Sequence, residues 1–120
     1  GLRTKNNVLF DLPEYVALLD IFPQAGALLD TGHAHVNGWD IPAVVKALGE
    51  RLAACHVHDN DGNGDAHLPV GQGDIDWKAY FGAVKKYAPQ ATQVFEYCCG
   101  FNNTKDLEAH IAELKEDYKL

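Results

Sequence analysis

The sequence predicts an α/β fold in which short parallel strands alternate with helices. Along most of the chain, segments with helical features alternate with short apolar segments, and each apolar segment ends in Asp, His or Glu. Helices that alternate with buried strands are typical of a parallel sheet built from right-handed crossover connections. The chain has 120 residues, which suits one domain or part of a larger one.

Four segments are expected to be helical. An apolar stripe marks the first of them, Asp11 can cap it, and Pro13 lies in its first turn. Asp40 can cap the second helix, and Asp74 or Asp76 can cap the third. The four helical segments are residues 10–22, 40–52, 76–89 and 103–120.

The expected strands are three short apolar segments at residues 25–30, 52–59 and 92–97. A three-stranded parallel sheet has two open edges and little core. Both faces of such a sheet are ordinarily covered by helices. We therefore expect this chain to be part of a larger domain.

Composition argues against several classes of protein. The formal net charge is −7, and an acidic chain is poorly suited to non-specific nucleic-acid binding, which depends on Lys and Arg. No apolar run is long enough for a transmembrane helix, and residues 1–10 lack the apolar core of a signal peptide. We therefore expect a cytoplasmic protein without a membrane span. The three cysteines, Cys55, Cys98 and Cys99, are expected to be buried reduced thiols on strands.

Metal-capable side chains stand at the ends of the three predicted strands, namely Asp30, His58 and Glu96. The carboxyl ends of parallel strands meet at one edge of the sheet, where the active sites of such folds lie. Asp, His and Glu together form a mixed nitrogen and oxygen ligand set for a divalent cation. The sequence leaves an alternative open for each residue: Asp30 in a turn, His58 in the core, and Glu96 paired with an arginine or a backbone cap.

Two neighbours could orient His58. His56 lies two residues earlier on the same strand and faces the same way, one layer deeper. Asp61, in the following loop, could accept a hydrogen bond from the His58 ring.

A second group of candidate ligands lies in loops. Asp65 and His67 are two residues apart, and His33 follows the first strand end by three residues. His35 is in the same loop as His33 but is expected to lie on the surface. The glycines Gly71 and Gly73 precede a predicted helix, and a glycine loop at a helix N-terminus can hold an anion such as a phosphate.

Four motifs, in this order, resemble the closing motifs of the xylose-isomerase-like TIM barrels. They are "LLDTGHAH", "HVHDNDG", "DAHLPVGQGDIDW" and "FEY", and the resemblance covers residues 11 to 115. This superfamily includes sugar and sugar-phosphate isomerases and epimerases, and endonuclease IV. The resemblance implies that residues 1–120 form the C-terminal half of a (β/α)8 barrel, with three parallel strands, four helices and the N-terminal strands missing.

The resemblance also implies a divalent metal, Mn²⁺, Zn²⁺ or Mg²⁺, held by Glu, Asp, His and Glu from four strands. Asp30, His58 and Glu96 match the last three ligands, and the first Glu has no match here. In the endonuclease IV branch, residues matching His33, Asp65 and His67 hold an additional zinc. In the epimerase branch, the residue matching His33 contacts the substrate.

From this resemblance we expect a metal-dependent sugar or sugar-phosphate isomerase or epimerase. Glu96 and His33 are the expected catalytic residues, and His33, His56 and Trp39 the expected substrate contacts. The epimerases that act on free ketoses carry an Arg shortly after the His ligand, and "DGNGD" has none here.

Two alternatives stay open: a zinc phosphodiesterase of the endonuclease IV type acting on abasic DNA, and a truncated chain without activity. The isolated chain is expected to be inactive and to form homo-oligomers through its exposed barrel edges.

Overall fold

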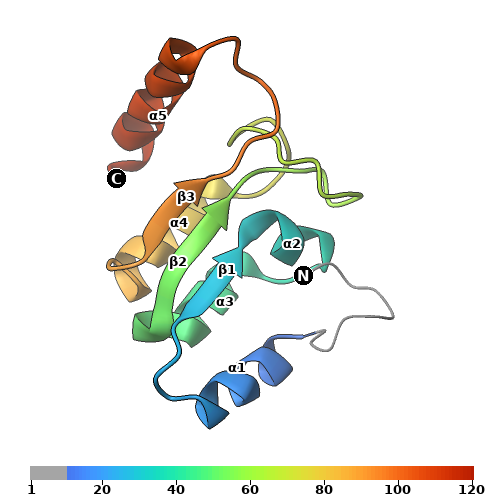
Figure 1. Cartoon of the computed structure of the whole chain (residues 1–120), viewed down its shortest axis with the longest axis vertical. Coiled ribbons are helices and arrows are strands. Elements are labelled where there is room, and N and C mark those ends of the chain that lie inside the picture. The colour runs from blue at the N-terminus through green and yellow to red at the C-terminus, as the bar shows by residue number, and fades with distance from the viewer. Residues whose placement is uncertain (1–10) are drawn as a thin grey trace.

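The computed structural model describes residues 11–120, and its centre is a parallel sheet of three strands in the order β1-β2-β3. The strands are β1 (Ala27–Asp30), β2 (Leu52–Val57) and β3 (Thr92–Phe95). The helices are α1 (Leu12–Ile21), α2 (Thr31–Val36), α3 (Ile41–Leu48), α4 (Trp77–Tyr87) and α5 (Thr104–Tyr118), and a 3-10 turn spans Gly49–Arg51. The chain therefore alternates between helices and parallel strands, as expected (Figure 1).

The α/β class and the three parallel strands are confirmed, whereas the expected number of four helices is wrong, because residues 11–120 contain five. The additional helix is α2, which directly follows β1. It begins there because the Asp30 carboxylate accepts a hydrogen bond from the His33 N–H at 2.8 Å, which is a side-chain N-cap. His33 and His35 consequently lie on a helix rather than in a loop.

Helix boundaries follow the expected caps. Asp11, Asp40 and Asp76 each accept a hydrogen bond from the backbone N–H three residues later. The second predicted helix is shorter than expected, because Gly49 adopts a positive φ of 50° and the chain enters β2 at Leu52.

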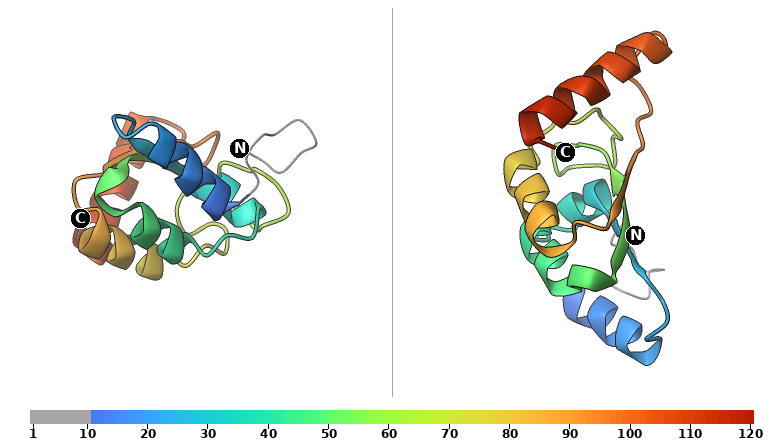
Figure 2. Two further views of the ribbon diagram at one scale, coloured as in Figure 1. Left: turned by 90° about the horizontal axis from the view of Figure 1, so that it is seen from below. Right: turned by 90° about the vertical axis from the view of Figure 1, so that its left-hand side faces the viewer.

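The two faces of the sheet differ in their surroundings. Leu29, Cys55 and Val57 point to the face that α3 and α4 cover, and each is at most 2% exposed. In the side view, α2, α3 and α4 lie on one side of the sheet (Figure 2). On the opposite face, Leu28 is 45% and Val94 43% exposed. The described residues thus bury one face of the sheet and leave apolar side chains on the other.

The outer edge of β1 is bonded to a side chain of α1. The Tyr15 hydroxyl accepts a hydrogen bond from the Leu28 N–H at 3.0 Å and donates one to the Leu28 carbonyl at 2.9 Å. These bonds satisfy two backbone groups that an edge strand otherwise leaves unpaired. Burial raises the pKa of Tyr15 above its ordinary value, although the hydrogen bond with Leu28 and the charge of Arg51 act in the opposite direction.

The cysteine prediction is correct for one residue of three. Cys55 is buried on β2, but Cys98 and Cys99 follow β3 and are exposed. They are exposed because the strand ends at Phe95, so the chain has already left the sheet.

Within residues 11–120, no helix combines the length and the apolar character needed to cross a membrane. The expectation about residues 1–10 lies outside the described residues, and the cytoplasmic location stays a prediction.

Candidate functional site

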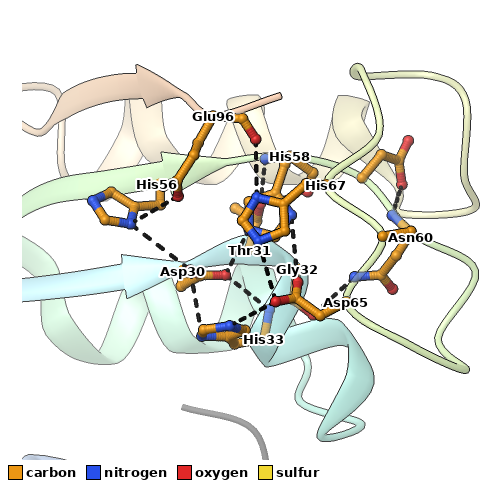
Figure 3. Close-up of polar contacts among 12 residues, drawn as sticks. Asp30, Thr31, Gly32, His33, His56, His58, Asn60, Asp65, His67 and Glu96 are labelled. Atoms are coloured by element: carbon orange, nitrogen blue, oxygen red, sulfur yellow. Dashed lines mark hydrogen bonds and ion pairs between the residues drawn. The ribbon is translucent and has the colours of Figure 1, made fainter. Parts of the chain in front are cut away.

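The carboxyl ends of the three strands bring Asp30, His58 and Glu96 together. Each residue offers one ligand atom, and these atoms all lie within 4.8 Å of one another (Figure 3). Strand register explains the meeting, because Asp30 pairs with His56 across the sheet and the Glu96 N–H donates to the Val57 carbonyl at 3.1 Å. The three residues thus occupy one rim of the sheet.

His58 is the buried member of the group, with no exposed surface. Its backbone is held by Thr31, whose hydroxyl donates to the His58 carbonyl at 2.9 Å and accepts from its N–H at 3.1 Å. The ring lies against Gly32, where a Cβ would be only 2.1 Å from Cε1. Thr31 and Gly32 therefore fix the place of this ring, and neither was singled out from the sequence.

The two ring nitrogens of His58 face two different carboxylates. Nε2 lies 3.0 Å from Asp30 Oδ1, and Nδ1 lies 3.8 Å from Asp65 Oδ1. Among residues 11–120, neither nitrogen has a partner with hydrogen-bond geometry, and the same is true of the buried Asp65 Oδ1. Buried polar atoms are normally paired, so these atoms point to a missing partner such as a cation.

Asp30 is surrounded by donors. Burial opposes its ionisation, but the contact with His58 and the hydrogen bond from the His33 N–H outweigh that effect, and the pKa of Asp30 lies below its ordinary value. Its Oδ2 is also 3.3 Å from Nδ1 of the His33 ring. Asp30 is therefore held as a carboxylate, the form that binds a metal.

His56 does not contact His58 as expected. Its Nδ1 lies 3.2 Å from Glu96 Oε2 and 3.8 Å from Asp30 Oδ2. His58 lies past the end of β2, whose last residue is Val57, and its ring lies between Asp30 and Asp65. His56 thus positions the Glu96 carboxylate, whose side chain is 48% exposed.

Asp65 connects the second group of candidate ligands. Its Oδ2 is 3.0 Å from His33 Nε2 and 3.1 Å from His67 Nε2. Ligand atoms of His58, Asp65 and His67 lie within 4.8 Å of one another, and the His58 and His67 rings stack with centroids 3.8 Å apart. His33 joins this cluster through Asp65.

His67 is held in an unusual backbone conformation, with φ of 48°. Its Nδ1 lies 3.2 Å from the Glu96 carbonyl, which can only accept, so Nδ1 carries the proton. Burial lowers the pKa of His67, but this hydrogen bond and the charge of Asp65 raise it above the ordinary value. In its neutral form the ring would direct the lone pair of Nε2 toward the cluster, as a metal ligand must.

The loop from residue 60 to 76 is organised by Asp59, which sequence reasoning passed over. This fully buried carboxylate accepts hydrogen bonds from the N–H groups of Asn60, Gly71 and Ile75, at 2.9, 2.9 and 3.3 Å. Trp77 Nε1 donates a fourth at 2.7 Å. The signal in the sequence was an Asp followed by a glycine-rich loop and an aromatic.

Two suggestions about this loop have different outcomes. A glycine loop of this kind can hold an anion, and here the Gly71 N–H donates to the internal carboxylate of Asp59. Asp61 was expected to orient His58, but its carboxylate accepts from the N–H and side chain of Asn63 instead. Asp65, rather than Asp61, is the carboxylate beside the His58 ring, with Oδ1 3.8 Å from Nδ1.

Beside the rim is a pocket of about 350 Å³ that contains the expected substrate contacts Trp39, His33 and His56 in its lining. Asp30 lines the same pocket, together with the apolar side chains of Leu28 and Ala34. His35 was expected on the surface and is half-buried, with Nε2 2.6 Å from Asp74 Oδ1.

Residues 2–116 match the family model described as the xylose isomerase-like TIM barrel. The chain belongs to this family. The expected fold class is thereby confirmed: the structure is part of a barrel of this type.

A solved structure described as a D-tagatose 3-epimerase-like protein is similar to 98% of this chain, with a TM-score of 0.68 and 26% sequence identity. This chain covers 44% of that protein. An uncharacterized protein of Methanocaldococcus jannaschii is 36% identical over 58 residues, and one of Sinorhizobium fredii is 37% identical over 59. These matches span 48% and 49% of this chain but only 22% and 19% of the two relatives.

Proposed function

We propose that this chain supplies the metal-binding rim of a sugar or sugar-phosphate isomerase or epimerase. The observation that carries the proposal is the convergence of Asp30, His58 and Glu96, whose ligand atoms lie within 4.8 Å of one another. The ring nitrogens of the buried His58 find no hydrogen-bond partner among residues 11–120. Family membership and the likeness to a D-tagatose 3-epimerase-like protein support the choice of reaction.

The residues of the rim fit one divalent cation such as Mn²⁺, Zn²⁺ or Mg²⁺. Asp30 and Glu96 would give carboxylate oxygens, and His58 would give Nε2, the nitrogen that faces Asp30 at 3.0 Å. His58 Nδ1 would then donate to Asp65 Oδ1, now 3.8 Å away. A carboxylate behind a ligating histidine is the usual arrangement at metal sites, so Asp65 would orient the ligand.

When bound, the cation would polarise a substrate carbonyl. Glu96 is half-exposed and its carboxylate is 3.2 Å from His56, so it can take a proton from the carbon next to that carbonyl and return it. His33 and Trp39 line the adjoining pocket. His33 would hold a substrate oxygen, and Trp39 would pack against the carbon skeleton of the sugar.

We propose further that the 120-residue chain alone is inactive and self-associates. Leu28 and Val94 are exposed on the open face of the sheet. The candidate ligands stand at the carboxyl ends of the same sheet. The packed interior of a barrel of this kind needs eight parallel strands, and the described residues supply three. A second copy could cover the open face of the first.

A zinc phosphodiesterase of the endonuclease IV type is the second candidate. The observation in its favour is the neighbouring group of His58, Asp65 and His67, which could bind another ion. The formal charge of −7 opposes it, because DNA binding depends on basic residues. Nucleic acid is therefore the less favoured substrate.

Zinc stoichiometry separates the two candidates. One ion per chain, unchanged in His67→Ala, favours the isomerase and leaves His67 to the hydrogen bonding of its loop. Two or three ions per chain, one of which is lost in His67→Ala, would favour the phosphodiesterase. The variant must keep the circular dichroism spectrum of the wild type.

Substrate binding can be tested without turnover. The Mn²⁺-loaded chain should increase the relaxation rates of protons of added ketoses or ketose phosphates, and Asp30→Asn should abolish this effect. His35→Gln serves as the matched control, because His35 lies on the same helix but contacts Asp74 rather than the rim. No enhancement with any sugar tried, or enhancement that persists in Asp30→Asn, would contradict the proposed function.

Light scattering and an isomerase assay test the state of the isolated chain. We expect a dimer or larger assembly and no turnover. A monodisperse monomer, or turnover of a sugar phosphate at ordinary enzyme rates, would refute this part of the proposal.

A further inference from the structure

Cys98 and Cys99 form a pair of exposed thiols that the proposed reaction does not use. They follow β3 and line a second pocket, of about 520 Å³, which is separate from the one beside the rim. Three aromatic side chains, Phe95, Tyr97 and Phe101, line the same pocket. Two thiols thus stand beside a surface suited to a flat apolar group.

The two thiols belong to consecutive residues and line the same pocket. The neighbouring Cys98 thiol raises the pKa of the Cys99 thiol above its ordinary value. The Cys98 backbone N–H donates to the His67 carbonyl at 3.1 Å, and its thiol lies 3.2 Å from the Ala66 carbonyl. These bonds hold the backbone and the thiol of Cys98 in place beside the pocket.

Adjacent cysteines are poorly placed for a disulfide. Consecutive Cα atoms across a trans peptide are about 3.8 Å apart, whereas disulfides usually join Cα atoms about 4.4–6.8 Å apart. No peptide bond among residues 11–120 is cis. An arsenic atom between the two sulfurs bonds each of them separately, so the sulfurs need not approach to the length of an S–S bond.

We propose that Cys98 and Cys99 form a binding site for trivalent arsenicals that carry an aromatic substituent. Arsenic would bond both sulfurs, and its ring would lie against Phe101 and Tyr97, whose own centroids are 5.6 Å apart. For an arsine oxide the reaction balances without an oxidant. Two S–H bonds and the As–O bond break, two As–S bonds form, and one water molecule leaves with the two protons.

Phenylarsine oxide is the probe that tests this site on the full chain. Mass spectrometry of the intact, reduced protein should show one adduct, heavier by one phenylarsenic unit less two hydrogens. Thiol titration should show that both exposed thiols are consumed while the buried Cys55 is not. Cys99→Ser should abolish the stable adduct, and so should Cys98→Ser. Cys99→Ser is the first choice, because it keeps the contact of Cys98 with Ala66.

The aromatic wall has its own test. Phe101→Ala should weaken phenylarsine oxide binding about threefold to tenfold, as expected for the loss of one aromatic contact, and should leave binding of inorganic arsenite unchanged. An adduct that survives in either cysteine variant, or no adduct in the wild type, would overturn the proposal. Equal weakening of both arsenicals by Phe101→Ala would overturn the role of the pocket.

Discussion

Replacing Asp59 by Asn removes the acceptor that organises the loop carrying Asp65 and His67. The carboxylate is fully buried and accepts four hydrogen bonds, two on each oxygen. Asparagine has the same shape but only one acceptor oxygen. Two of the four donors would therefore lose their acceptor and face an NH₂ group.

The expected loss of stability follows from those two bonds. A hydrogen bond to a charged group contributes about 1.5–3 kcal/mol, so two of them amount to about 3–6 kcal/mol. Relief from burying a charge offsets part of this sum, and we expect the lower end, about 3 kcal/mol. For a domain of this size that corresponds to a fall in Tm of roughly 10–20 °C.

Urea unfolding followed by the fluorescence of Trp39 and Trp77, together with thermal melting, measures this loss. Asp61→Asn is the matched control, because it is the same change in the same loop. Its exposed carboxylate accepts hydrogen bonds, among residues 11–120, from Asn63, and its unfolding midpoint should match the wild type. Both proteins are compared at one concentration, because self-association stabilises the folded state. Equal midpoints for Asp59→Asn and Asp61→Asn would refute the assigned role of Asp59.

Three further substitutions have defined outcomes. Gly32→Ala should displace the His58 ring, because the new Cβ would lie 2.1 Å from Cε1, and titration with Mn²⁺ should show weaker binding; unaltered affinity would contradict the contact. Gly82→Ala should instead stabilise the chain by about 1 kcal/mol in urea unfolding, since this helical position is open around its Cβ; a lower midpoint would count against it. Asp65→Asn should weaken metal binding about 10–100-fold by calorimetry, and a wild-type affinity would show that Asp65 does not orient His58.

Much of the site could be predicted because strand ends in a parallel sheet meet at one edge. Asp30, His58 and Glu96 each stand at the end of an apolar segment in the sequence, and the structure brings all three together. The strands themselves were found because four to six apolar residues with polar neighbours are typical of a buried parallel strand.

The errors concern side chains whose partners are far away in sequence. The Asp59 carboxylate bonds Gly71, Ile75 and Trp77, contacts that only the folded loop creates. Helix α2 was missed because it has six residues, too few for an apolar period to show. The side chain of His56 reaches Glu96 because of the register between β2 and β3, which a sequence pattern does not fix.

Spectroscopy of bound Mn²⁺ tests the central claim most directly. In chains labelled with ¹⁵N-histidine and given millimolar Mn²⁺, electron spin echo modulation reports whether an imidazole nitrogen binds the ion. We predict one directly bound histidine nitrogen, lost in His58→Gln and retained in His35→Gln. Absence of any histidine coupling in the wild type, or coupling that survives in His58→Gln, would contradict the assignment of the metal to this rim.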